Sequence, residues 1–353
     1  MIVATTRGES VSTDETQPRV RSATLSDVAQ AAGVSIATAS KALNGRDQVR
    51  AETRDRVVKA AERLAFFPNA LAKGLLAGRT GTVGLLTSDL EGRFSIPILM
   101  GAEDAFGAGK VSVFLCDARG DAIREQHHVQ ALLSRRVDGL IVVGSSTDPR
   151  SSLGRELPVP VVYVYSPSDD PEDLSIVTDN VDAGKQAVEH LITTGRRRIA
   201  HITGDASYAA ARDRAAGVEA ALRDQGLPLV GDRSLFGSWN EAWGRGAARL
   251  LLDRAAEVDA IVAGSDQIAR GVMDALHELG RGIPDDIAVI GFDNWPILAT
   301  NSRPQLTSID LRLEELGRLG AQRLFEAMDG DVRHGTESLH ARVVTRGSTT
   351  PSN

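Results

Sequence analysis

The hydrophobic positions of this 353-residue chain follow two different periods. Over residues 24–64 they recur at intervals of three and four, which is the period of an amphipathic helix. From about Thr82 onward, short apolar runs alternate with helical patterns. Residues 1–22 are polar and have no period, which predicts a disordered leader. The pattern therefore divides the chain into a small helical module and a longer α/β body.

The helical module begins with a stretch, residues 24–44, that predicts two short helices around Gly33. Thr24 and Asp27 have the spacing of a capping box, and Gly33 supplies the left-handed residue that ends a helix. Ser35 is placed to cap the second helix. The inward positions of these two helices are Leu25, Val28, Ala29, Ala32, Val34, Ala39 and Leu43. A third helix over residues 51–65 closes the core with Val57, Val58, Ala61, Leu64 and Ala65.

The second helix has a further face, made of Ser35, Ile36, Ala37, Thr38, Ser40 and Lys41. Most of these side chains are short, so the face could enter a DNA major groove without a clash. An ordinary helical hairpin is the alternative. The whole chain has a net charge of −7, but residues 19–79 hold 11 Lys and Arg against 5 Asp and Glu. A basic module on an acidic body favours a polyanion as the partner of that module.

This module resembles the N-terminal helix-turn-helix of the lactose/galactose repressor family. The matching runs are Leu25–Ala29, Ala32–Ser35, Ala37–Gly45, Thr53–Val57 and Pro68–Ala72, and the resemblance continues to about Thr345. It implies a sequence-specific DNA-binding protein. By the resemblance, Ile36, Ala37 and Lys41 lie at base edges. Ser35, Thr38, Ser40 and Asn44 are placed to hold phosphates.

The segment from Pro68 to Leu76 resembles the family's hinge helix, which orders on the operator. A helix of about two turns is marginal alone in water, so it needs a partner to fold. The resemblance assigns Asn69 and Leu75 to DNA contact, with Leu75 as a wedge in the minor groove. Packing of Leu75 in an interdomain linker is the alternative. Gly74 replaces a more usual serine and weakens the helix by about 1 kcal/mol relative to alanine.

The body predicts an α/β fold of doubly wound parallel sheets. The expected strands are 83–87, 111–116, 139–143, 161–165, 199–203, 259–263 and 287–291. The expected helices are 98–108, one through 130–133, 181–193, 212–223, 241–252, 267–279 and 312–328. The resemblance implies a periplasmic-binding-protein-like pair of lobes, joined by three chain crossings, with the last helix returning to the first lobe.

The resulting domain plan has five parts: a leader over 1–22, a DNA-binding domain over 23–67, a hinge and linker over 68–80, a two-lobed domain over 81–345 and a tail over 346–353. After Thr345 no leucine heptad follows from which a tetramer-forming bundle could be built. Because one helix-turn-helix contacts only one half-site, the plan predicts a homodimer on a pseudo-palindromic operator.

Ligands of open α/β sheets bind beyond the carboxyl ends of the strands. The candidate effector residues there are Asp89, Phe94, Arg214, Trp239, Ser265 and Asp293. A carboxylate, a guanidinium and an aromatic face together suit a sugar or sugar derivative. An interlobe salt bridge remains open for Arg214 and Asp293, and core packing for Trp239. Asp266 is expected to cap its helix.

Several candidate positions depart from the family's commoner residues. They are the run Gly92-Arg93-Phe94-Ser95, Tyr165 and Ser265. The effector's identity therefore does not transfer from the resemblance, and neither does its role as inducer or corepressor.

An enzyme of the same fold class is the main alternative, but its signatures are missing. The chain has no phosphate loop, no dinucleotide-binding glycine motif and no nucleophile elbow, and its histidines lack metal spacing. We expect no catalytic residues, no metal and no cofactor. The single cysteine, Cys116, is expected in a buried strand and fits a reducing compartment.

A free-standing sugar-binding protein for uptake is the second alternative, and the absence of a signal peptide counts against it. No apolar run is long enough to cross a bilayer, so no membrane partner is expected. The sequence thus predicts a cytoplasmic transcription factor, a repressor, that responds to a small-molecule effector.

Overall fold

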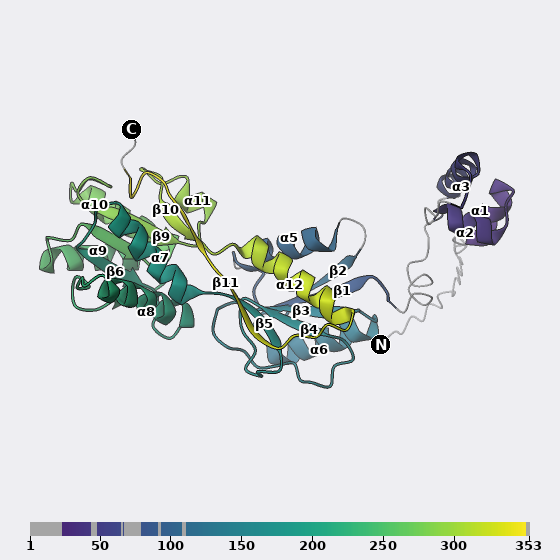
Figure 1. Cartoon of the computed structure of the whole chain (residues 1–353), viewed down its shortest axis with the longest axis horizontal. Coiled ribbons are helices and arrows are strands. Elements are labelled where there is room, and N and C mark those ends of the chain that lie inside the picture. The colour runs from purple at the N-terminus through teal and green to yellow at the C-terminus, as the bar shows by residue number, and fades with distance from the viewer. Residues whose placement is uncertain are drawn as a thin grey trace, which may run out of the picture. The chain divides into compact units, whose positions relative to one another are not determined.

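A computed structural model describes residues 23–43, 48–64, 66, 79–90, 93–107 and 111–350. The chain divides into two compact units, Met1–Gly78 and Arg79–Asn353, which are described separately below (Figure 1).

The N-terminal unit contains α1 (Leu25–Ala32), α2 (Ile36–Leu43) and α3 (Ala51–Arg63). The predicted capping box is present, because the Thr24 backbone N–H donates to Asp27 Oδ2 at 2.8 Å and the Asp27 N–H donates to Thr24 Oγ1 at 3.3 Å. Gly33 follows α1 with φ of 64°, a left-handed conformation in which a Cβ would be strained. Local sequence signals therefore fix the turn between α1 and α2.

The core of this unit consists of small and β-branched side chains from all three helices. Its buried members are Val28, Ala29, Ala32, Ala39, Ala42, Val49, Val57, Ala60 and Ala61. The prediction that Val58 points inward is wrong, since its side chain is 38% exposed. Neighbouring residues on a helix diverge by about 100°, and with Val57 inward the buried stripe passes through Ala60 and Ala61 instead.

The second unit is built on two six-stranded sheets. The first has the order β11-β5-β4-β3-β1-β2 and is parallel throughout. Its strands are β1 (Thr82–Thr87), β2 (Ser112–Asp117), β3 (Gly139–Val143), β4 (Val161–Val164), β5 (Leu174–Thr178) and β11 (Gly335–Leu339).

The second sheet has the order β12-β10-β9-β8-β6-β7 and is parallel except for β12, which runs antiparallel to β10. Its strands are β6 (Ile199–Thr203), β7 (Leu235–Phe236), β8 (Ala260–Ala263), β9 (Ala288–Phe292), β10 (Thr307–Asp310) and β12 (Arg342–Val344). Each sheet forms the centre of one lobe, which confirms the predicted doubly wound α/β architecture.

Helices cover both faces of each sheet. In the first lobe, α5 (Ser95–Phe106) and α12 (Leu313–Met328) share one core cluster, while α6 (Ala122–Ser134) belongs to another. In the second lobe, α9 (Glu241–Arg254) and α10 (Asp266–Glu278) cover one face, and α7 (Asn180–Thr193) and α8 (Ala209–Asp224) cover the other. The short α11 (Pro296–Ala299) follows β9.

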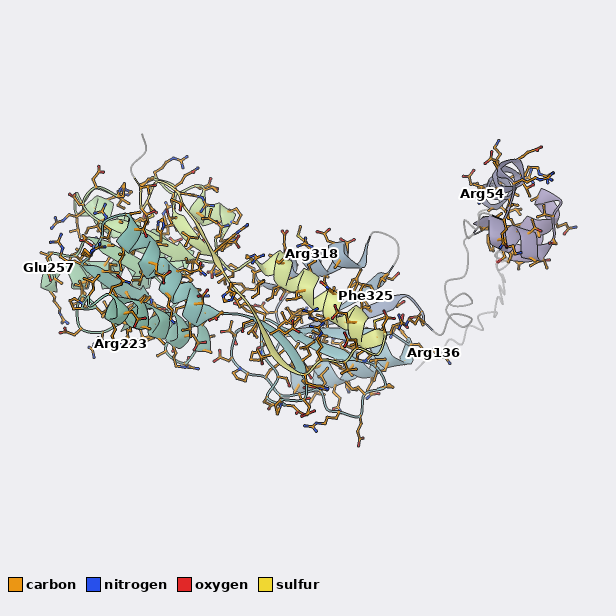
Figure 2. The ribbon with its side chains drawn as sticks, in the orientation of Figure 1. Arg54, Arg136, Arg223, Glu257, Arg318 and Phe325 are labelled. Carbon is orange, nitrogen blue, oxygen red and sulfur yellow. The ribbon has the colours of Figure 1, made fainter. Side chains whose placement is uncertain are left out.

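The chain passes between the lobes three times, as the resemblance implied. It leaves the first sheet after β5, returns from β10 into α12, and crosses again between β11 and β12 (Figure 1). Helix α12 packs closely on α5, because a Cβ on Gly317 would lie 1.9 Å from the Ile98 carbonyl oxygen. Phe325 of α12, labelled in Figure 2, lies on the helix that covers this face of the first sheet. Its ring meets that of Phe106 of α5 edge-on, with ring centroids 5.1 Å apart.

Two expectations about the ends of this unit need correction. Strand β2 is an edge strand and not a buried one, so Cys116 is only half-buried and Phe114 is 43% exposed. Residues 346–350, assigned by sequence to a tail, follow the second sheet, where the Ser348 hydroxyl donates to the Val289 carbonyl oxygen at 2.6 Å. Among the helices that the structure describes, none has the length and apolarity needed to span a bilayer.

Candidate functional site

Helix α2 presents the face that sequence assigned to DNA. Ser35, Ile36, Ala37 and Lys41 are exposed, and Thr38 and Ser40 are half-buried. The Thr38 backbone N–H donates to Ser35 Oγ at 3.1 Å, so Ser35 caps α2 as predicted. Its hydroxyl also lies 2.8 Å from Thr38 Oγ1. The other three DNA candidates, Asn44, Asn69 and Leu75, lie outside the described residues.

The second unit contains a cavity of about 200 Å³ between its two lobes. Its walls follow the carboxyl ends of seven strands, where a ligand of an open α/β sheet is expected. The first lobe contributes Arg93, Phe94, Ser145, Ser146, Thr147 and Tyr165, and the second contributes Tyr208, Ala210, Arg214, Trp239, Gln267 and Asp293. Four of the six effector candidates from the sequence therefore come together here.

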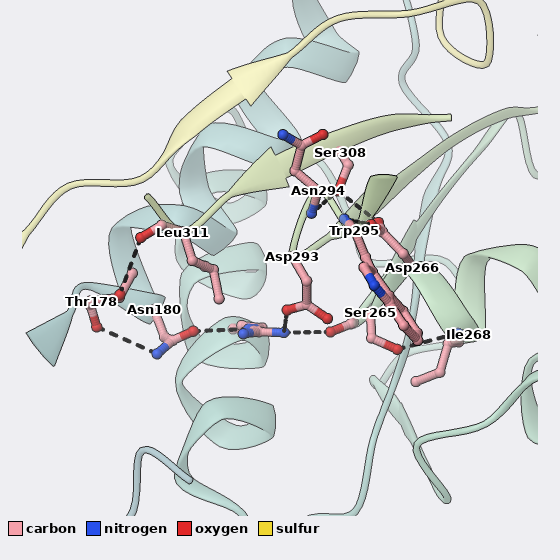
Figure 3. Close-up of polar contacts among 12 residues, drawn as sticks. Thr178, Asn180, Ser265, Asp266, Ile268, Asp293, Asn294, Trp295, Ser308 and Leu311 are labelled. Atoms are coloured by element: carbon pink, nitrogen blue, oxygen red, sulfur yellow. Dashed lines mark hydrogen bonds and ion pairs between the residues drawn. The ribbon is translucent and has the colours of Figure 1, made fainter. Parts of the chain in front are cut away.

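Arg214 of α8 is held almost entirely inside the second lobe, with only 2% of the residue exposed. Its Nε donates to Asn180 Oδ1 at 2.8 Å, and its Nη1 donates to the Gly264 carbonyl oxygen at 2.6 Å. The same Nη1 lies 3.6 Å from Asp293 Oδ1, and Figure 3 shows Asn180 and Asp293 in this network. The guanidinium is thus fixed in place before any ligand arrives.

Asp293 follows β9 and joins the two lobes. Its Oδ2 pairs with Arg93 of the first lobe, whose Nη1 also donates to Gln267 Oε1 at 2.9 Å. Its side chain is only 3% exposed, and its Oδ1 accepts no hydrogen bond from a described residue. Thr147 Oγ1, in the first-lobe wall, is also buried without a described hydrogen-bond partner. Buried polar atoms without a hydrogen-bond partner are uncommon in folded proteins, and a ligand in the cavity could satisfy both of these.

A second contact between the lobes lies at the start of α8. The Ala209 backbone N–H donates to Asp148 Oδ1 at 2.8 Å, and Arg212 Nη2 lies 3.5 Å from the same oxygen. Asp148 comes from the first lobe and follows β3. The described contacts at Asp293, Gln267 and Asp148 therefore join the two lobes around the cavity.

Aromatic rings line both sides of the cavity. Phe94 stacks on Tyr165 with ring centroids 5.1 Å apart, and Trp239 meets Tyr208 edge-on at 6.1 Å. Trp239 also packs against the second-lobe core, which is one of the two roles left open by the sequence, while stacking on an effector stays a prediction. Burial raises the pKa of Tyr165, so its phenol stays neutral.

Two of the described residues with a strained backbone conformation lie in the cavity wall. Tyr165 and Asp293 adopt φ of 76° and 95°, respectively, conformations that residues with a Cβ rarely hold. Each costs on the order of 1–3 kcal/mol and persists only when the surroundings enforce it. These costs are found where strands end and side chains turn into a site.

The remaining effector candidates, Ser265 and Asp89, lie outside the cavity wall. Ser265 is fully buried and caps α10 by accepting from the Ile268 N–H at 3.2 Å. Asp89 is braced through its backbone, because its N–H donates to Thr87 Oγ1 and its carbonyl oxygen accepts from Ser95 Oγ at 2.7 Å. Both residues shape segments that lead into the cavity.

The expectation that Asp266 caps α10 is wrong, because Ser265 holds that position. Asp266 instead accepts from the Ser308 hydroxyl at 2.6 Å and from the Trp295 N–H at 2.7 Å (Figure 3). Burial, and then the charge of Asp293, raise its pKa to about 8. Near pH 7 this carboxyl is therefore mostly protonated and nearly neutral.

Sequence reasoning missed several wall residues, chiefly Arg93, Ser145–Thr147 and Gln267. The polar run Ser145–Thr147 follows the strongly apolar strand β3, which is the signal that could have marked it. Within the described ranges, no group of three or more His, Cys, Asp or Glu has an arrangement that could hold a metal ion.

A helix-turn-helix unit joined to a two-lobed unit with a ligand-sized cavity defines a ligand-responsive DNA-binding regulator. Comparisons with known proteins agree. Residues 24–69 match the model of bacterial regulatory proteins of the lacI family, and residues 188–349 match the periplasmic binding protein-like domain. The chain belongs to the LacI family of transcriptional regulators, which are not enzymes.

Similar proteins cover nearly the whole chain. Catabolite control protein A from Priestia megaterium is 32% identical over 329 residues, which is 92% of this chain and 99% of that protein. A transcriptional regulator CelR–cellobiose complex is 31% identical with a TM-score of 0.61, covering 92% of this chain and 99% of that one. A Lac repressor dimer bound to operator and the anti-inducer ONPF is 28% identical with a TM-score of 0.75, covering 93% and 99%.

Proposed function

We propose that this protein is a cytoplasmic repressor that binds a pseudo-palindromic operator as a homodimer and responds to a small sugar or sugar derivative in the interlobe cavity. The observation that carries the proposal is the buried Asp293 Oδ1, which accepts no hydrogen bond from a described residue and lies 3.6 Å from Arg214 Nη1, in the wall of a cavity of about 200 Å³. A buried carboxylate oxygen without a donor is costly, and a ligand hydroxyl would satisfy it.

The size and lining of the cavity suit one sugar ring. Its volume lies below the roughly 300–1,000 Å³ of pockets for drug-sized ligands. Phe94 and Trp239 offer aromatic faces for the apolar side of a pyranose, while Asp293 and Thr147 offer polar groups to its hydroxyls. The CelR complex holds cellobiose, which supports a carbohydrate as the ligand class.

Several exposed hydrophobic side chains on the first lobe support dimerisation. They are Ile96 and Met100 on α5, and Phe114 and Leu115 on the edge strand β2. Exposed apolar side chains and an unpaired strand edge favour contact with another chain. The Lac repressor forms a dimer on its operator. Light scattering at micromolar protein tests this, and a stable monomer or tetramer would contradict the dimer.

The coupling would run from the cavity through the first lobe to the hinge. Effector binding would change the closure of the two lobes. Closure would in turn change the relative orientation of the two first lobes in a dimer. Couplings of this kind are typically about 1–3 kcal/mol and act in both directions.

A thermal-shift screen against sugars, followed by operator binding, tests the proposal. A ligand at a hundred times its dissociation constant stabilises the folded protein by about 2.7 kcal/mol. We expect at least one sugar to raise the melting temperature and to change operator affinity measured by fluorescence anisotropy. The proposal fails if the purified protein binds no DNA from its own upstream region, or if no sugar changes that binding.

A further inference from the structure

The walls of the interlobe cavity hold an excess of positive charge. Two guanidinium groups, Arg93 and Arg214, line it together with a single carboxylate, Asp293. Both arginines pair with that carboxylate, Arg93 at Oδ2 and Arg214 at Oδ1. One negative charge is therefore shared between two positive charges.

Two buried titratable groups near the cavity add little charge to it near neutral pH. Asp266, the nearest other buried carboxyl, is mostly protonated because burial and Asp293 raise its pKa to about 8. His201 is neutral, since burial lowers its pKa to about 3. The cavity wall itself therefore holds two guanidinium groups against one carboxylate.

Aromatic rings reduce the cost of this charge but do not remove it. Arg214 Cζ lies 4.7 Å from the Phe292 ring centroid, and Arg93 Cζ lies 4.7 Å from that of Phe94. A cation over a ring is stabilised by about 0.5–2 kcal/mol. Burying an uncompensated charge costs considerably more, so buried charges are normally paired.

The hydrogen-bond donors show the same excess. Arg93 Nε is buried and has no hydrogen-bond partner among the described residues. Arg214 uses Nε and Nη1 on Asn180 and Gly264, and no described residue accepts from its Nη2. Two cationic donors on opposite lobes therefore need acceptors. A carboxylate or a phosphate carries two or more charged oxygens that such donors bind strongly.

We propose that the effector is an acidic monosaccharide whose carboxylate or phosphate is bound between Arg93 and Arg214. This inference rests on the proposed function, because it assumes that the cavity is the effector site. It assigns the hydroxyls of the ligand to Asp293 Oδ1 and Thr147 and its anionic group to the arginines. Arg93 also lines a neighbouring cavity of about 420 Å³.

The test compares matched neutral and acidic sugars by calorimetry on the purified full-length protein at pH 7 and low salt. The ligands are glucose, glucuronate and glucose 6-phosphate, and galactose, galacturonate and galactose 6-phosphate. We expect an acidic member of at least one series to bind at least tenfold tighter than its neutral partner. Tighter binding of the uronate assigns the anionic group as a carboxylate, and tighter binding of the ester assigns it as a phosphate.

Variants then examine the role of Arg93. Arg93→Gln should reduce the ratio of acidic to neutral affinity at least tenfold, while Arg93→Lys, which keeps the charge, should retain most of it. Arg119→Gln is the matched control, because the Arg119 side chain is 74% exposed and outside the cavity, so the ratio should not change.

The possible failures are distinguishable. If a neutral sugar binds as tightly as its acidic partners and alters operator affinity, the charge inference is overturned and the proposed function stands. An unchanged ratio in Arg93→Gln also overturns the inference. If none of the six ligands binds, the inference is overturned, and the proposed function is then decided by the wider thermal-shift screen against sugars.

Discussion

The two candidate sites of this protein place their polar groups in opposite surroundings. On α2, Ile36 is 53% exposed and Lys41 is exposed beside it. In the interlobe cavity, Arg214 is 2% exposed and the Asp293 side chain 3%. The candidate DNA face is exposed to solvent, whereas the charged side chains of the candidate effector site are buried and form ion pairs with one another.

This difference decides how substitutions act. A side chain on a solvated face holds little of the fold together, so its loss changes affinity and leaves stability nearly unchanged. A buried charge with several partners contributes to both ligand affinity and folding stability, because its removal leaves the partners without a hydrogen bond. Each cavity variant therefore needs a stability measurement, and the α2 variants serve as a contrast.

Arg214→Ala should give the largest effect. It leaves the Asn180 amide oxygen and the Gly264 carbonyl oxygen without their donor, and it removes one of the two cations that pair with Asp293. Loss of one partner of a buried pair typically destabilises by about 3–5 kcal/mol. Urea denaturation measures this, and the effector response should also disappear. Wild-type stability would show that the network is not important for the fold.

Asp293→Asn should have the second-largest effect, and it separates effector binding from folding stability. The amide keeps the size of the carboxylate but not its charge, and we expect effector affinity to fall about a hundredfold through weaker hydrogen bonds. Effector-free operator affinity should remain within a few-fold of wild type. A normal effector response in this variant would contradict the assignment of Asp293 to the effector site.

Asp266→Asn should change the pH dependence of stability. Asp266 keeps its proton in the folded state up to a pKa of about 8, against an ordinary value of 3.8. Folding therefore takes up a proton between these values, and the stability of the wild type falls as pH rises toward 8. The slope is at most about 1.4 kcal/mol per pH unit. Asparagine cannot ionise, so the free energy of unfolding of the variant should rise relative to that of the wild type between pH 5 and pH 7.5. If the two proteins show the same dependence of unfolding free energy on pH, the expectation is contradicted.

Lys41→Ala on α2 should have the smallest effect on the fold. We expect an unchanged melting temperature and a loss of preference at one base pair per half-site, corresponding to about 1–3 kcal/mol of discrimination. Thr38→Ala is the companion variant, and it should weaken binding to all sequences about equally. If Lys41→Ala also weakened all sequences uniformly, Lys41 would be a phosphate contact.

The sequence predicted the elements whose signals are local. The capping box at Thr24, the turn at Gly33 and the apolar strands of both lobes all appeared as expected. The strands that were missed, β5, β7, β10, β11 and β12, depend on distant pairing. β11 alternates between half-buried and exposed positions in the polar run Gly335–Leu339, and it forms only because β5 is beside it. Its sequence alone gives no such signal.

The candidate site was predicted in part for the same reason. Strand ends pointed to Phe94, Trp239 and Asp293, since parallel strands bring their carboxyl ends to one edge. The pairing of Arg93 with Asp293 joins residues of different lobes and depends on how the lobes close. Neither the period of the sequence nor its resemblance specifies that closure, so the charge excess of the cavity became visible only in three dimensions.

The three crossings between the lobes have a consequence for biosynthesis. Leu174 pairs with Gly335, and helix α12 covers the first sheet, so the second lobe is inserted within the first along the chain. A ribosome therefore releases nearly all of the second lobe before the first lobe has its last strand and covering helix. Translation arrested before residue 335 would leave the first sheet with an open edge, and a nascent chain acquires its effector site only near the end of synthesis.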